Sequence, residues 1–412
     1  MSWAWESIEL GNVADIRYGY TAKASWDKQG PKFLRITDIQ NGAVHWDAVP
    51  TAKMDKTDFE KHRLKSGDIV FARTGATTGK SYKISSPPDA VPASYLIRLR
   101  LKDTNILPEY VSYFFQTEAY WNVINLGTSG SAQGGFNASK LSQLTIPKPT
   151  LSEQKRIVAI LDEAFAGIDT AIANTEKNLA NARELFESCL NSVFCTDGRW
   201  NEFELSGLVE RDCSLSYGIV QPGGEVASGL PVVRPTDLGN KIITLDGLKR
   251  IDPSLAKSYT RTVLQGHELL LCVRGSTGTV SLASEELKGA NVTRGIVPIR
   301  FDQSIVGQAF GYYSLRTPTA KRQIANKTYG AALMQINIRD LRKLKLGIPP
   351  IALQHEIVAE IEEVEMELQR LESIYARKLE VLHEFKQSLL HKAFSGELTA
   401  SLADKELGEA VA

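Results

Sequence analysis

The chain has 412 residues with 48 basic and 48 acidic side chains, so its formal net charge is zero. It contains no apolar run near 18 residues and no signal peptide, which argues against membrane insertion and export. Its four cysteines, Cys189, Cys195, Cys213 and Cys272, form no CxxC pair and suit neither a disulfide-rich scaffold nor a zinc site. We therefore expect a cytoplasmic protein with no membrane partner.

Residues 1–150 are predicted to form a first globular domain. Short apolar runs with β-branched residues, separated by glycine and proline, predict strands at Asp68–Ala72 and Ser94–Leu101. A segment of this length can bury a self-supporting core. We expect an α+β fold.

Residues 151–197 are predicted to form a long helix. Pro147 and Pro149 hold the approach extended, and Ser152 is the predicted N-cap. Apolar residues then recur at spacings of three and four, interrupted only by Thr175. The predicted seam consists of Val158, Leu161, Phe165, Ile168, Ile172, Leu179, Ala182, Phe186, Cys189 and Val193. A period of 3.5 residues is typical of a coiled coil, so this helix requires a partner helix.

The rest of the chain repeats this plan. A second globular domain is predicted at 198–350, with strands at Glu268–Val273 and Gly295–Phe301, then a second long helix at 351–396 and a tail at 397–412. Lys378 interrupts the second helical seam. That seam consists of Ile357, Ile361, Val364, Leu368, Leu371, Tyr375, Leu382, Phe385 and Leu389.

Matching residues recur about 200 positions apart throughout the chain. The pairs are Tyr18/Tyr217, Arg35/Arg234, Arg73/Arg274, Tyr113/Tyr313, Leu144/Leu344, Pro149/Pro349, Gln154/Gln354 and Val158/Val358. An internal repeat of this kind predicts two homologous globular domains alternating with two long helices, related by a pseudo-twofold repeat.

The neutral total conceals a division of charge. Residues 1–150 and 198–350 carry +4 and +7, whereas 151–197 and 351–412 carry −4 and −7. Basic globular domains on acidic helices fit domains that contact a polyanion. Glutamate-rich outer faces are also common on coiled coils, and that interpretation remains open.

No motif for catalysis or metal binding emerges. Gly75–Ser81 resembles a phosphate-binding loop, but three residues separate its glycines where four are needed. We interpret it, like Gly275–Thr279, as a glycine-rich turn after a strand. No Asp/Asn/Ser-Pro-Pro-aromatic motif for amino-methylation is present, and the six histidines lack metal-binding spacing. The chain is predicted to bind rather than to react.

The residues that lead into the helices carry a resemblance. Ile146–Val158, IPKPTLSEQKRIV, is similar to the IPxPPLxEQxxIV pattern that opens the conserved helix of specificity (S) subunits of type I restriction–modification systems. Ile348–Val358 is a weaker second copy, and Leu389–Leu398 resembles the usual ending of that family. The resemblance covers essentially the whole chain.

This resemblance implies a non-catalytic, sequence-specific DNA-binding subunit. Its two target-recognition domains would each read one half of a bipartite, asymmetric site in double-stranded DNA. The helices would pack as an antiparallel coiled coil, set the spacer between the half-sites and dock two methyltransferase subunits. S-adenosylmethionine, ATP and Mg are expected on partner subunits, which include restriction/translocase subunits, and no cofactor or metal is expected in this chain.

The duplication guides the choice of DNA-binding candidates. Positions shared by both copies should be scaffold or should contact phosphates, and divergent polar positions should read bases. The shared candidates are Arg35, Arg234, Arg73 and Arg274, which could equally clamp Asp38, Asp237 or turn carbonyls. The divergent candidates are Tyr20, Lys23, Lys80, Ser131, Gln133, Gln221, Arg294, Lys327, Tyr329 and Gln335.

Two other functional classes remain open. A coiled-coil adaptor or scaffold, whose globular domains bind protein rather than DNA, would not require basic domains. A DNA-modifying enzyme complete in one chain is disfavoured by the missing methylation and nuclease motifs.

Overall fold

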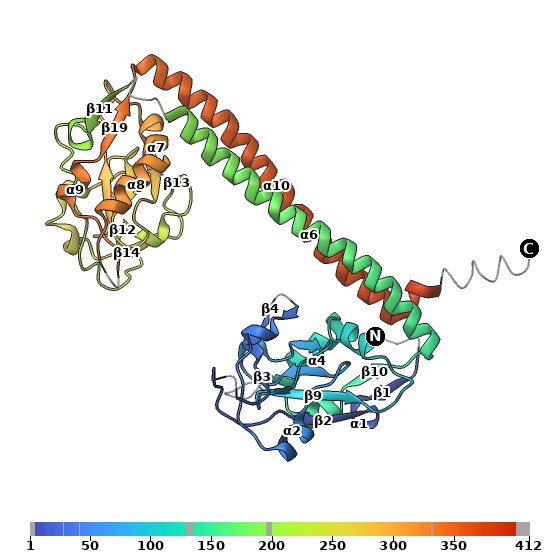
Figure 1. The fold of residues 1–412 in the computed structure, drawn as a ribbon. Helices are drawn as coiled ribbons and strands as arrows, with labels where there is room; N and C mark the ends of the chain where they lie inside the picture. The colour runs from blue at the N-terminus through green and yellow to red at the C-terminus, as the bar shows by residue number, and fades with distance from the viewer. Residues whose placement is uncertain are drawn as a thin grey trace, which may run out of the picture. The chain divides into compact units, whose positions relative to one another are not determined.

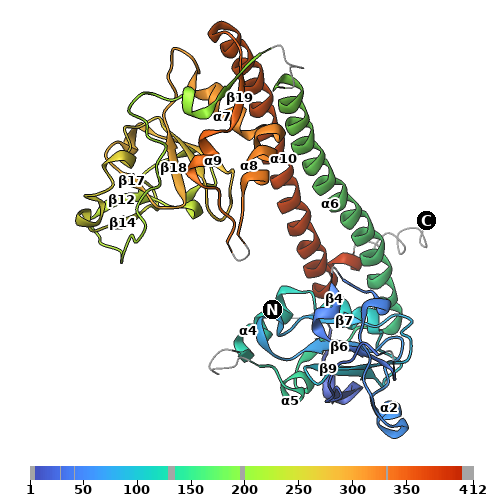
Figure 2. The same ribbon diagram turned by 60° about the vertical axis from the view of Figure 1, so that its left-hand side comes forward.

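The chain folds into two compact units in its computed structural model, which describes residues 5–27, 29–40, 42–128, 135–194, 200–330 and 333–400. One unit joins 1–175 to 376–412, and the other is 176–375. The long helices are α6 (Leu151–Phe194) and α10 (Ile351–Ser395), which lie side by side (Figures 1 and 2). The first unit contains the start of α6 and the end of α10, and the second contains the reverse. The helices therefore pack antiparallel, as predicted.

The first globular part is built on an antiparallel sheet in the order β2-β9-β6-β7, in which β6 and β9 lie side by side (Figure 2). Two-stranded sheets pair β3 with β8, β4 with β5, and β1 with β10. The elements are β1 (Ser7–Glu9), α1 (Leu10–Val13), β2 (Ala14–Tyr18), β3 (Lys32–Leu34), β4 (Ile39–Gln40), β5 (Ala43–Val44), α2 (Lys56–His62), β6 (Ile69–Ala72), β7 (Ser81–Lys83), β8 (Ala90–Pro92), β9 (Leu96–Leu101), α3 (Pro108–Phe114), α4 (Glu118–Thr128), α5 (Ala138–Ser142) and β10 (Thr145–Pro147).

The second globular part repeats this design with sheets in the orders β13-β16-β15-β18, β14-β12-β17 and β11-β19. The pair β11 and β19 lies side by side in Figure 1. Its elements are β11 (Asn201–Glu204), β12 (Leu230–Val233), β13 (Ile242–Ile243), β14 (Lys249–Ile251), β15 (Leu269–Cys272), β16 (Val280–Ala283), β17 (Asn291–Val292), β18 (Ile296–Ile299), α7 (Gln308–Arg316), α8 (Pro318–Lys327), α9 (Ile338–Arg342) and β19 (Lys345–Ile348). The predicted α+β class is confirmed, and β6, β9, β15 and β18 fall inside the four predicted strand ranges.

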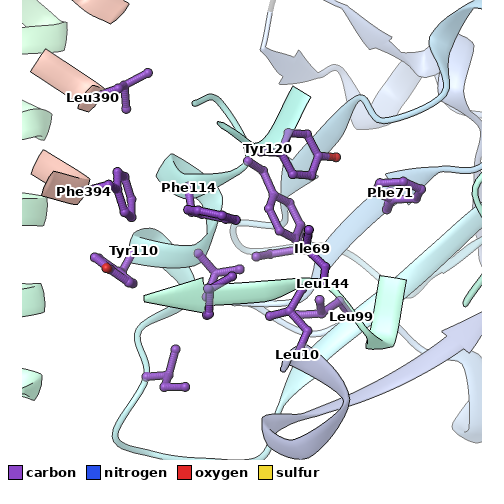
Figure 3. Close-up of a cluster of buried hydrophobic side chains, with 14 of the residues drawn as sticks. Leu10, Ile69, Phe71, Leu99, Tyr110, Phe114, Tyr120, Leu144, Leu390 and Phe394 are labelled. Atoms are coloured by element: carbon purple, nitrogen blue, oxygen red, sulfur yellow. The ribbon is translucent and has the colours of Figure 1, made fainter. Parts of the chain in front are cut away.

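The end of α10 completes the core of the first unit. Leu390 and Phe394 point from α10 towards Tyr110 and Phe114 (Figure 3). The ring centroids of Phe394 and Tyr110 lie 4.9 Å apart. In the second unit the end of α6 completes the core in the same way, because Phe194 packs against Phe310 with ring centroids 5.1 Å apart. Each globular part is therefore held by the start of one long helix and the end of the other.

A buried glutamine fastens the start of each helix to its globular part. Gln154 and Gln354 are fully buried. The Gln154 Oε1 accepts from the backbone N–H of Leu107, and its Nε2 donates to the carbonyls of Asn105 and Pro149, all at 2.9–3.0 Å.

Gln354 makes the equivalent bonds. Its Oε1 accepts from the N–H of Gly307 at 2.9 Å, and its Nε2 donates to the carbonyls of Ile305 and Pro349 at 2.8 and 2.9 Å. We call Gln154 and Gln354 the glutamine clamps. Each one fixes where its helix meets its domain.

The predicted cap of the first helix is wrong by two residues. Ser152 lies inside α6, and the Thr150 hydroxyl instead accepts from the N–H of Glu153 at 3.3 Å. The correction has a simple cause, because Thr150 also satisfies the capping rule and has an acidic residue three positions later.

The seam is confirmed for most of α6 and is partly wrong for α10. Leu371 and Phe385 are 38% and 51% exposed. Glu372 and Lys386 are less exposed than these two, and they form ion pairs with α6: Glu372 with Arg183 at 2.7 Å and Lys386 with Asp169 at 2.8 Å. Long polar side chains can cover an apolar seam with their stems, so polar residues occupy positions that the apolar pattern did not predict.

An ion cluster joins the second globular part to α10. Glu365 is 8% exposed. Its carboxylate accepts from the Lys241 Nζ at 2.8 Å, the Tyr313 hydroxyl at 2.7 Å and Arg316 at 2.9 Å. In the first unit the matching tyrosine, Tyr113, donates to Asp162. The two junctions therefore differ in chemistry.

Across the described ranges, no helix is both long and apolar enough to cross a membrane.

Candidate nucleic-acid interface

Three of the predicted DNA-binding arginines lie around one hollow of about 620 Å³ in the second unit. Arg234 follows β12 and Arg294 follows β17, and these two strands run parallel, so their ends meet at one edge. The N–H of Val273, just before Arg274, donates to the carbonyl of Gly295 at 2.8 Å. Three strand ends therefore bring three guanidinium groups to the same place.

Gly295 is required for this convergence. A Cβ at this position would lie 2.4 Å from the Pro235 side chain, which is closer than carbon atoms can approach. The hollow is consequently shaped by backbone packing rather than by mobile side chains.

Arg234 and its counterpart Arg35 are structural clamps. In both, Nε and a terminal nitrogen donate to the two carboxylate oxygens of the aspartate three residues later, at 2.7–3.1 Å. The hydrogen bonds with Asp38 and Asp237 raise the pKa of both guanidinium groups. Each aspartate also accepts from the backbone N–H of its arginine. The clamp interpretation that the sequence left open therefore describes these two residues.

Arg274 and Arg294 are differently placed. Neither guanidinium makes a hydrogen bond or ion pair with any residue in the described parts of the chain, and Arg294 is exposed while Arg274 is half-buried. Two positive groups thus face the hollow without internal counter-charges, which is the arrangement that binds an anion such as a phosphate.

The first unit carries a modified copy of this arrangement. The Arg73 Nε donates to the carbonyl of Ser94 at 3.0 Å, and its guanidinium lies 4.9 Å from the ring centroid of Tyr18. Ser94 and Tyr95 occupy the positions of Arg294 and Gly295, because β9 and β18 pair in matching fashion with β6 and β15. Tyr95 is 63% exposed. Serine therefore replaces the arginine, and an exposed aromatic ring occupies the position of the glycine.

The Tyr-Gly pair found in both copies has a structural cause. A Cβ on Gly19 would lie 2.2 Å from the Ala93 carbonyl oxygen, and one on Gly218 would lie 1.9 Å from that of Val292. Only glycine permits this contact between backbones. The preceding tyrosines, Tyr18 and Tyr217, remain exposed at these sites.

The structure separates the remaining predicted residues. Tyr329 and Gln335 form an antiparallel bridge, and Gln335 also bridges to Arg274, so both lie near the hollow. Tyr20 instead packs against His62, with ring centroids 5.5 Å apart. Lys23, Lys80 and Gln221 are exposed, Lys327 is half-buried at the end of α8, and Ser131 and Gln133 lie outside the described residues.

Apolar residues at the hollow escaped the sequence analysis. Leu333 and Val220 line it and are 46% and 47% exposed. A search restricted to polar side chains could not find them. The difference between Ser94-Tyr95 and Arg294-Gly295 could have been detected in the sequence, because the strands that follow these residues match at an interval of 200 residues.

No group of three or more histidine, cysteine, aspartate or glutamate side chains suited to a metal ion occurs within the described ranges.

The whole chain is similar to proteins of one family. Residues 4–181 and 199–376 each match the family described as the type I restriction modification DNA specificity domain. The EcoBI specificity subunit of Escherichia coli is 23% identical, covering 96% of this chain and 87% of that protein. The putative MjaX specificity subunit of Methanocaldococcus jannaschii is 24% identical, covering 96% and 93%.

Solved structures agree on the fold. A chain from a structure of a type I restriction–modification system has a TM-score of 0.75 at 20% identity, covering 97% of this chain and all of that chain. The HsdS subunit of Thermoanaerobacter tengcongensis has a TM-score of 0.53 at 19% identity, covering 96% and 97%. The duplicated match spans most of the sequence, and the chain therefore belongs to the specificity subunits of type I restriction–modification systems.

Proposed function

We propose that this chain supplies the DNA sequence recognition of a type I restriction–modification complex. Each globular part would read one half of a bipartite, asymmetric site in double-stranded DNA, and the two long helices would set the spacer between the halves. The observation that carries this proposal is the duplicated strand-end site. Its frame is the same in both units, while the side chains on the frame differ: Arg294-Gly295 in one and Ser94-Tyr95 in the other.

A common frame with different readers suits two unlike half-sites. Arg73 and Arg274 would contact phosphates, which position the protein without reading sequence. The predicted pairing of these two arginines is wrong by one residue, because the N–H of Arg73 donates to the carbonyl of Tyr95 as that of Val273 donates to the carbonyl of Gly295. The two arginines therefore leave their strands at neighbouring positions of the common frame. Arg294 could make a bidentate contact to guanine, whereas Tyr95 offers an aromatic ring in place of that donor pair. The two domains would therefore prefer different bases.

The long helices would dock partner subunits. In the second unit, Met366 and Ile374 on α10 are 62% and 50% exposed, and in the first unit Val381 and Phe385 are 44% and 51% exposed. Exposed apolar side chains on acidic helices are suited to protein partners rather than to DNA. We assign these faces to two methyltransferase subunits, which the restriction/translocase subunits would join.

Chemistry would reside in those partners. In this proposal they bind S-adenosylmethionine, ATP and Mg, methylate adenine and cleave DNA in the cytoplasm, while this chain acts without catalysis or cofactors.

The test is methylome sequencing of cells that express this chain with its neighbouring methyltransferase. A matched variant would carry residues 198–350 from a relative with a different target. We expect a bipartite methylated motif in the wild type, and a motif with only one half changed in the variant. Methylation that does not depend on this chain would refute the proposal and favour the adaptor interpretation.

A further inference from the structure

Two neighbouring apolar residues are exposed at the edge of the arginine-lined hollow of the second unit. Leu333 and Met334 are 46% and 45% exposed, and Leu333 lines the same hollow as Arg274 and Arg294. Exposed apolar side chains within a cationic site do not favour solvation, and they are not needed to bind a phosphate. Their position therefore calls for a partner with both charged and apolar surfaces.

The backbone holds these side chains in a defined place. The backbone groups of Tyr329 and Gln335 exchange hydrogen bonds of 2.9 and 2.8 Å. Gly330 has φ +125°, and a Cβ there would lie 2.3 Å from the carbonyl oxygen of Leu333. No other residue could replace this glycine without strain.

Met334 and Ile336 are also fastened to the residues on both sides of Arg274. The N–H of Gly275 donates to the carbonyl of Met334 at 2.8 Å, and the N–H of Ile336 donates to the carbonyl of Val273 at 3.0 Å. The backbone of Met334 is consequently held beside that of Arg274. A ligand that binds Arg274 in the hollow meets Leu333, which lines it, and lies next to Met334.

We propose that Leu333 and Met334 insert between neighbouring base pairs of the bound DNA and kink it. This inference rests on the proposed function, in which the second globular part binds duplex DNA. Duplex DNA has phosphates outside and apolar base faces inside, and leucine and methionine are among the side chains that enter base steps. Arg274 holds a flanking phosphate while the apolar pair unstacks one step.

The kink would contribute to sequence selection. Pyrimidine–purine steps unstack more readily than others, so a wedge favours them without hydrogen-bonding to any base. Specificity at that step would then depend on DNA deformability, and Arg274 would add affinity at every sequence.

The experiment uses the full chain with its methyltransferase partners and a duplex that carries the methylated motif. 2-Aminopurine is placed in turn at each position of the second half-site except the methylated adenine, and end-labelled duplexes report bending by energy transfer. The variants are L333A/M334A and the volume-conserving exchange L333M/M334L. Ile242→Ala is the matched control, since Ile242 is 53% exposed in the same unit and does not line the hollow.

We expect binding of the wild type to raise the fluorescence at one step and to bend the duplex. L333A/M334A should abolish both signals and weaken specific binding about 10- to 100-fold, with little change in non-specific binding. The exchange variant and I242A should behave as the wild type. If L333A/M334A fails to fold, L333A alone carries the test, because Leu333 lines the hollow.

The two proposals fail in distinguishable ways. Specific binding with an unchanged bend and fluorescence in L333A/M334A overturns the wedge and leaves the DNA-binding function intact. Absence of motif-specific binding by the wild-type complex overturns the proposed function itself.

Discussion

Replacing Gln354 by alanine tests whether the glutamine clamps fix the long helices to the globular parts. The substitution removes three hydrogen bonds at a fully buried site. It leaves the N–H of Gly307 without an acceptor and the carbonyls of Ile305 and Pro349 without their donor. The fold is otherwise untouched, because the rest of α10 keeps its contacts.

The expected loss follows from those orphaned groups. Each buried polar group that loses its partner costs about 1–3 kcal/mol, and water entering the space left by the side chain offsets part of this. We expect the local opening free energy to fall by about 2–4 kcal/mol. At about 1.4 kcal/mol per tenfold change, hydrogen exchange at the Gly307 amide should accelerate about 30- to 700-fold.

The assay is hydrogen exchange followed by mass spectrometry on the full chain. The duplication provides an internal control: Q354A should deprotect Gly307 and leave Leu107 unchanged, and Gln154→Ala should do the reverse. Gln387→Ala serves as a matched control on α10, because that glutamine is exposed. Q354E should also accelerate exchange at the Gly307 amide at neutral pH. Its carboxylate can accept from the N–H of Gly307, but it cannot donate to the carbonyl oxygens of Ile305 and Pro349, which it would face.

Two results would refute this reasoning. Unchanged exchange at Gly307 in Q354A would show that the side chain contributes no local stability. Equal acceleration in both units would show general destabilisation instead of a local clamp. In the methylome, a released clamp should broaden the spacer of the motif while preserving both half-site sequences.

Three further predictions follow from the site and the helices. Arg274→Ala should weaken DNA binding at all sequences and reduce the slope of log affinity against log salt by about 1, measured by titration at several salt concentrations. Arg234→Ala should instead lower the unfolding temperature and leave that slope unchanged. Burial alone would raise the pKa of Glu365, but hydrogen bonds from Lys241 and its neighbours outweigh it and lower that pKa, so its stabilisation is present above about pH 5 and is lost as pH falls through the folded-state value. Glu365→Gln should therefore destabilise the protein by roughly 1–3 kcal/mol at pH 7, and the difference in thermal unfolding should vanish in acid. Lengthening the helix within 164–182 by a few residues should change the spacer of the methylated motif and not its half-sites; an unchanged spacer would contradict the ruler.

The sequence predicted the elements of the fold where one physical pattern dominates. Strands such as β6 and β15 are buried on both faces and consist of continuous apolar runs, so their positions follow from composition. The repeat revealed Gln154 and Gln354 as a matched pair. Their role required the structure, because burial and hydrogen-bond partners are set by loops 47–49 residues away.

The seam of α10 shows where an apolar pattern misleads. Leu371 and Phe385 fit the heptad spacing and are nevertheless exposed, whereas Glu372 and Lys386 pair across to α6. The aliphatic stems of an ion pair can cover a seam as an apolar residue does. Either Leu371 or the next residue, Glu372, could therefore face α6, and the same holds for Phe385 and Lys386. The side chains of the partner helix decide which one does.

The candidate site was also predicted only in part, because side-chain partners depend on the folded structure. Sequence matching found the arginines, but it could not tell that Arg234 is engaged by Asp237 while Arg294 is free, because that depends on where each side chain points after its strand ends. Leu333 escaped because an exposed leucine looks like a core residue in a sequence.

The division between shared and divergent residues has a physical basis in the structure. Shared residues, such as the glutamine clamps and Arg35 and Arg234, make several hydrogen bonds within their own domain, so changing them in one copy would damage that domain. Tyr95 and Arg294 project from equivalent strand ends without such obligations. Substitutions there cost little stability and alter what each domain presents to DNA. A duplicated chain can therefore acquire two different half-site preferences while its frame, and with it the attachment of both long helices, stays the same.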